Sequence, residues 1–63
     1  MNDAVTILLV EDEFLNRSLV QAILSRARDE RLRSAVVSEA DTLGAARQAL
    51  ADEPLPDVIL LDV

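Results

Sequence analysis

The chain has 63 residues, of which 51% are hydrophobic, and its 12 acidic residues against 6 basic ones give a formal net charge of −6. Such an apolar composition excludes a disordered tail, and such a negative charge makes nucleic acid an unsuitable partner. Cysteine and histidine are absent, so disulfides, thiolate metal sites and imidazole chemistry are excluded, and carboxylates and arginine must do any ionic chemistry.

The first predicted element is a strand over residues 6–10, an uninterrupted apolar run that is typical of a strand buried on both faces of a parallel sheet. It ends abruptly in Glu11, Asp12 and Glu13. Helical spacing then predicts an amphipathic helix of about four turns. We expect this helix to begin near residues 13–14 and to fray around residues 28–31. Its predicted apolar stripe consists of Leu15, Leu19, Val20, Ile23, Leu24 and Ala27.

The second half of the chain predicts a weaker strand over residues 35–38, a second helix and a third strand over residues 57–62. Asp41 is the expected N-cap of the helix, and Gly44 within it is interpreted as a point of close packing. The segment 52–56 contains two prolines and is expected to end the helix. The helix's apolar stripe is expected to be Leu43, Ala46, Ala49 and Leu50.

The order of elements, β-α-β-α-β, predicts an α/β fold with a parallel sheet. Right-handed crossovers then favour strand order 2-1-3, the beginning of a doubly wound, flavodoxin-like sheet. In this order the two most apolar strands are neighbours. Their carboxyl ends meet where the winding reverses, which is where open α/β sheets bind ligands.

The acids that follow these two strands form the candidate site. Glu11 and Asp12 follow the first strand and Asp62 ends the third, so strands about 4.8 Å apart should bring the three carboxylates together. A cluster of carboxylate oxygens suits Mg²⁺, which also keeps waters that a phosphate can replace. The alternative is that each acid simply ends a strand or complements a helix dipole. The residues alone leave both interpretations open.

Two segments carry a family resemblance. Residues 7–13 (ILLVEDE) and 56–63 (PDVILLDV), together with Asn16 and Arg17, resemble response-regulator receiver domains of two-component signalling. The resemblance implies that Asp62 accepts a phosphoryl group from a histidine kinase or phosphotransfer protein. It also implies that Asp12 and Asp62 hold Mg²⁺, with Glu11 helping directly or through water.

Receiver domains continue beyond the third strand, where a hydroxyl residue and a lysine contact the phosphoryl group. This chain has no lysine, so residues 1–63 are expected to be a partial, truncated receiver domain of three strands and two helices. We expect weak phosphorylation at most, and a signalling receiver rather than an enzyme. The apolar edge at residues 58–61 is expected to promote self-association.

Two other function classes remain open. One is a degenerate receiver that binds proteins without phosphorylation, and the other is a fragment of a metal-dependent phosphohydrolase that uses Asp62 as its nucleophile. No signal peptide or membrane span is predicted, and we expect a cytoplasmic protein. A basic segment follows the first helix and is expected to be solvated, complementing the helix dipole rather than binding a partner. It contains Arg26, Arg28, Arg31 and Arg33.

Overall fold

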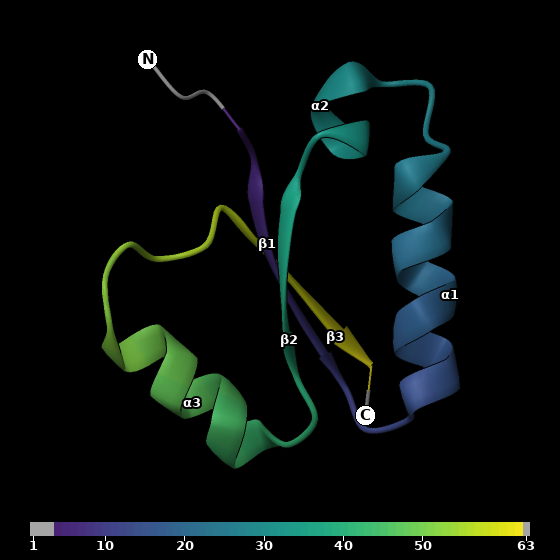
Figure 1. The fold of residues 1–63 in the computed structure, drawn as a ribbon. Helices are drawn as coiled ribbons and strands as arrows, with labels where there is room; N and C mark the ends of the chain where they lie inside the picture. Colours follow the sequence, from purple (N-terminus) through teal and green to yellow (C-terminus); the bar gives the residue numbers. More distant parts are fainter. Residues whose placement is uncertain (1–3, 63) are drawn as a thin grey trace.

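The computed structural model describes residues 4–62, and at Asp62 it describes the backbone alone. Three parallel strands lie in the order β2-β1-β3, which confirms the predicted α/β arrangement and strand order. Figure 1 shows α1 and α3 on opposite sides of this sheet. The elements are β1 (Thr6–Glu11), α1 (Phe14–Ser25), α2 (Glu30–Arg33), β2 (Val36–Ala40), α3 (Leu43–Ala51) and β3 (Val58–Asp62).

The core is built on the central strand. Every residue of β1 from Ile7 to Glu11 is buried, as expected for a strand that pairs on both edges and is covered on both faces. Leu8 and Val10 pack with Ala40 of β2 and Ala46 of α3. Since side chains alternate along a strand, Ile7 and Leu9 face the opposite side, toward α1.

The apolar stripe predicted for α1 is only partly covered. Val20, Leu24 and Ala27 are half-buried, but Leu15 and Ile23 are 76% and 60% exposed, and none of the helix residues is fully buried. A three-stranded sheet is too narrow to cover both rows of apolar side chains. The expectation of one continuous buried stripe is therefore wrong for the row Leu15, Leu19 and Ile23.

The first helix also ends earlier than expected, at Ser25. The N–H groups of Arg26 and Ala27 donate to carbonyl groups three residues back, which tightens the last turn and closes the helix. Residues 30–33 form the separate short helix α2 where a frayed helix end was expected. The described residues therefore contain three helices, and the expectation of two is wrong.

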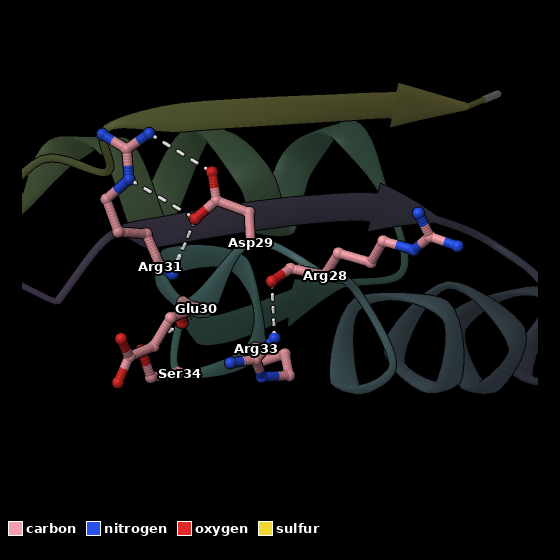
Figure 2. Close-up of polar contacts among 6 residues, drawn as sticks. All are labelled: Arg28, Asp29, Glu30, Arg31, Arg33 and Ser34. Atoms are coloured by element: carbon pink, nitrogen blue, oxygen red, sulfur yellow. Dashed lines mark hydrogen bonds and ion pairs between the residues drawn. The ribbon is translucent and has the colours of Figure 1, made fainter.

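Two arginines of the basic segment, Arg31 and Arg33, make contacts that hold α2 together. The Asp29 carboxylate caps α2 by accepting from the Arg31 backbone N–H at 2.8 Å, and it also pairs with the Arg31 guanidinium at 3.3 Å (Figure 2). Hydrogen bonds from Arg31 hold the pKa of Asp29 below its ordinary value. Arg33 donates to the carbonyl group of Arg28 at 2.6 Å. These contacts support a structural role for Arg31 and Arg33.

The second half of the chain follows the predicted order of elements, with corrections to the helix stripe, one strand end, one cap and one glycine. Of the apolar stripe predicted for α3 only Ala46 is buried, whereas Leu43 is 53% exposed and Leu50 36%. Strand β2 runs from Val36 to Ala40, two residues further than expected. The N-cap of α3 is Thr42, not Asp41, because the Thr42 hydroxyl accepts from the Ala45 N–H at 3.0 Å. Gly44 is not a point of close packing, since a Cβ atom there would lie 3.8 Å from the Thr42 hydroxyl, an ordinary contact. Within residues 4–62, helices are all too short to cross a membrane.

Candidate functional site at the carboxyl edge of the sheet

The backbones of the predicted acids lie close together at the carboxyl ends of β1 and β3. The register of β1 and β3 pairs Glu11 with Asp62, and Asp12 follows at the next position of the chain. The expected proximity of the first and third strand ends is therefore confirmed for the backbone. The side chain of Asp62 lies outside the described residues.

Glu11 is a buried acid with a fixed set of hydrogen-bond partners. Its side chain is only 4% exposed. One carboxylate oxygen, Oε2, accepts from the backbone N–H groups of Asp12 at 2.8 Å and Glu13 at 3.5 Å. The other, Oε1, accepts from the Asn16 side-chain amide at 2.9 Å. Glu11 thus joins the end of β1 to the first turn of α1, where the N-cap residue Glu13 has no side-chain capping bond of its own.

The electrostatics of Glu11 follow from these contacts. Burial alone raises the pKa of Glu11, because it disfavours the charged form. Hydrogen bonds that the carboxylate accepts from the Asn16 amide and from the backbone N–H groups of Asp12 and Glu13 favour the charged form and oppose the effect of burial. The pKa of Glu11 therefore lies below its ordinary value of 4.5, and the carboxylate is ionised near neutral pH.

Asp12 differs from Glu11 in its surroundings. Its side chain is exposed at the start of the turn that follows β1. A carboxylate oriented toward solvent can exchange water for a cation without losing contacts that support the fold. Of these two acids, Asp12 is therefore the one whose carboxylate is accessible to a cation, and Glu11, the last residue of β1, is suited to orienting the turn that carries Asp12.

Arg17 connects the carboxyl ends of β1 and β2. Its guanidinium donates to the Glu11 carbonyl oxygen at 2.8 Å and lies 3.7 Å from a carboxylate oxygen of Glu39. Gln21 donates to the other Glu39 oxygen at 2.8 Å, and the Arg17 guanidinium lies 5.8 Å from the centroid of the Phe14 ring. The sequence does not predict these partners for Asn16 and Arg17. Their position one turn into the helix that follows the acids is the signal that could have assigned them these contacts.

A shallow polar recess of about 300 Å³ opens beside this edge. Arg17 of α1, Glu39 of β2 and Ala45 of α3 are among the residues that line it. The recess lies at the carboxyl end of β2, and none of the predicted site acids lines it.

The amino ends of the strands, at the opposite end of the sheet from the predicted acids, carry a different arrangement. The Asp57 carboxylate accepts from the backbone N–H of Thr6 at 2.9 Å and from its hydroxyl at 3.1 Å. In return, the Asp57 N–H donates to the Thr6 carbonyl at 2.9 Å. An apolar cavity of about 280 Å³ opens at this amino end, lined by residues such as Leu8, Val36 and Pro56. It contains none of the predicted site acids.

Among the described residues, no three acids lie close enough together to hold a metal ion, and the third predicted ligand, the side chain of Asp62, is outside that set. The oxygen ligands of Asp12 and Glu11 are of the chemical type that Mg²⁺ prefers. Comparisons with models of protein families, with curated proteins and with solved structures found no match to the chain.

Proposed function

We propose that the chain is a receiver module of a phosphorelay, in which Asp62 accepts a phosphoryl group from a phosphohistidine of a kinase or phosphotransfer protein. The observation that supports this most is the β1–β3 register, which pairs residue 62 with Glu11 and brings it next to Asp12. The partner chemistry and the two-component context imply a cytoplasmic protein.

The reaction would use the residues of this chain as follows. A carboxylate oxygen of Asp62 attacks phosphorus, the bond between phosphorus and the histidine nitrogen breaks, and the nitrogen retains the electron pair. The product is an acyl phosphate on Asp62. Mg²⁺, when bound, would neutralise negative charge on the phosphoryl oxygens.

The ligand roles differ among the three acids. Asp12 and Asp62 would bind Mg²⁺ directly. Glu11 already accepts three hydrogen bonds, so it would act through water and by fixing the turn that positions Asp12. This division keeps the buried hydrogen bonds of Glu11 intact when the metal binds.

The experiment is labelling by a small phosphodonor, such as acetyl phosphate, followed by intact-mass analysis with and without Mg²⁺. We expect weak labelling of the wild-type chain by a single phosphoryl group, sensitive to hydroxylamine as an acyl phosphate should be. Asp62→Asn should abolish the label and Asp12→Asn should remove its dependence on Mg²⁺. Asp41→Asn is the matched control, because Asp41 is an exposed acid on the same edge, after β2. Equal labelling of wild type and Asp62→Asn would refute the proposal.

A second candidate is an interaction module that binds a kinase or another receiver without phosphorylation. Two observations favour it: the hydrogen bonds that occupy Glu11, and the absence of lysine from the chain. The same experiment separates the two candidates, because the interaction module predicts no label at saturating donor and Mg²⁺.

A further inference from the structure

Arg17 holds the peptide group that joins β1 to the acidic turn. Its guanidinium donates to the Glu11 carbonyl oxygen at 2.8 Å. Because a peptide group is planar and rigid, this contact restricts the orientation of the whole unit between Glu11 and Asp12, including the Asp12 N–H. That N–H donates to the Glu11 carboxylate, also at 2.8 Å. Arg17 and the Glu11 side chain therefore hold the two sides of one peptide group.

The guanidinium of Arg17 is itself held by a second strand. Its side chain is only 16% exposed, and its Nε lies 3.7 Å from a carboxylate oxygen of Glu39 in β2. Gln21, one turn further along α1, donates to the other Glu39 oxygen at 2.8 Å. Contacts with β1 and β2 thus keep the guanidinium in place, and from this position it can hold the acidic turn.

The charge of Arg17 acts against a cation at this end of the sheet. Like charges repel, and the paired Glu39 carboxylate offsets this repulsion in part. Loss of the positive charge alone should therefore strengthen the binding of a divalent cation by Asp12. Loss of the contact with the Glu11 carbonyl should weaken it, because the peptide group before Asp12 is released. The two effects have opposite signs, so the direction of the change shows which of them dominates.

We propose that Arg17 is a positioning residue of the cation site. It fixes the peptide group before Asp12, so that the Asp12 carboxylate can share a divalent cation with residue 62 of the neighbouring strand. This role rests on the proposed function, because it requires a cation at the carboxyl ends of β1 and β3. Replacing a residue that orients a metal ligand typically lowers metal affinity about 10–100-fold. Arg17 acts through the intervening Glu11, so we expect the lower end of this range.

The test is titration of the whole, isotope-labelled chain with Mg²⁺, followed by NMR through the backbone amide signals of Asp12 and Glu13. The measured quantity is the Mg²⁺ concentration at half saturation. We expect Arg17→Met to raise this concentration about tenfold. A purely structural role would lower the folded fraction and leave the concentration at half saturation unchanged. Asp12→Asn should remove the response, which would show that the signals report on this site.

Arg47→Met is the matched control, because Arg47 is an exposed arginine of α3 and its replacement removes the same charge. It should leave the Mg²⁺ concentration at half saturation within about twofold of the wild-type value, since solvent and salt screen an exposed charge. A value for Arg17→Met equal to that of the wild type, or lower as loss of the charge alone predicts, would overturn the proposal. A wild-type chain that does not respond to Mg²⁺ would overturn it as well.

Arg17→Lys keeps the proposal testable if Arg17→Met does not fold. Lysine retains the charge, but its single ammonium group cannot reproduce the planar fork that contacts Glu11 and Glu39 together. Its Mg²⁺ concentration at half saturation should therefore lie above the wild-type value, and an unchanged value would count against the proposal.

Labelling by acetyl phosphate separates the failure of this proposal from the failure of the proposed function. A wild-type chain that binds Mg²⁺ and takes up no label refutes the phosphorelay and leaves the role of Arg17 at the cation site intact. A chain that is labelled on Asp62, with a Mg²⁺ dependence that replacement of Arg17 does not alter, refutes the positioning role alone.

Discussion

Replacement of Leu9 by alanine should remove a large share of the free energy that stabilises the fold. Leu9 is in the central strand and is only 1% exposed, among the most completely buried side chains of the described residues. Leu→Ala substitutions at buried sites cost about 2–5 kcal/mol, because apolar contacts are lost and a cavity remains. A folded chain of 63 residues has a free energy of unfolding of about 3–9 kcal/mol. The substitution therefore removes a large share of the total stability.

The assay is urea unfolding followed by far-ultraviolet circular dichroism at fixed protein concentration, since the chain has neither tryptophan nor tyrosine for fluorescence. Leu15→Ala is the matched control. This substitution makes the same chemical change at a residue that is 76% exposed. It should alter the free energy of unfolding by about 0.5 kcal/mol or less. Equal losses for the two variants would show that the assignment of core and surface along β1 and α1 is wrong.

Three further changes test particular contacts. Gly44→Ala should stabilise the chain by about 0.5–1 kcal/mol in the same urea assay, because the added methyl group meets no obstacle and alanine favours the helix; a loss of stability would contradict the geometry of α3. Because the pKa of Glu11 is lowered on folding, its contribution to stability is present above pH 4.5 and is lost as the pH falls through its lower value in the folded chain. Thermal unfolding midpoints measured across this acid range should consequently fall less steeply for Glu11→Gln than for the wild type, and parallel pH profiles would refute the assignment. Asp57→Asn should lower the free energy of unfolding by about 1 kcal/mol through weakened hydrogen bonds to Thr6, whereas the exposed control Asp52→Asn should leave it unchanged.

The sheet could be predicted from the sequence because β1 and β3 are continuous apolar runs, and such runs have few alternatives to a central position in a parallel sheet. The right-handed crossover then left few strand orders, of which 2-1-3 is the observed one. The helix ends were predicted less well. Asp41 and Thr42 are both good N-cap residues, and only the path of the chain after β2 decides that Thr42 accepts the bond from Ala45.

The candidate site was predicted at the level of backbone position and not of side-chain partners. The order of strands predicts which residues end next to one another, so Glu11 and residue 62 could be paired in advance. The sequence does not indicate which of two adjacent acids turns inward. That depends on the donors within reach, and for Glu11 these are the Asn16 amide and two backbone N–H groups.

The reciprocal bonds between Thr6 and Asp57 have a consequence at the far end of the sheet. They fix the register of β3 against β1, and a slip of one residue would replace Asp62 by a neighbour opposite Glu11 and move each aliphatic side chain of β3 to the other face of the sheet. The alignment of the acidic edge is thus determined about 16 Å away, five residues along the strand. A substitution at Thr6 or Asp57, at the amino ends of the strands, should therefore shift residue 62 relative to Glu11 and Asp12 at the carboxyl ends.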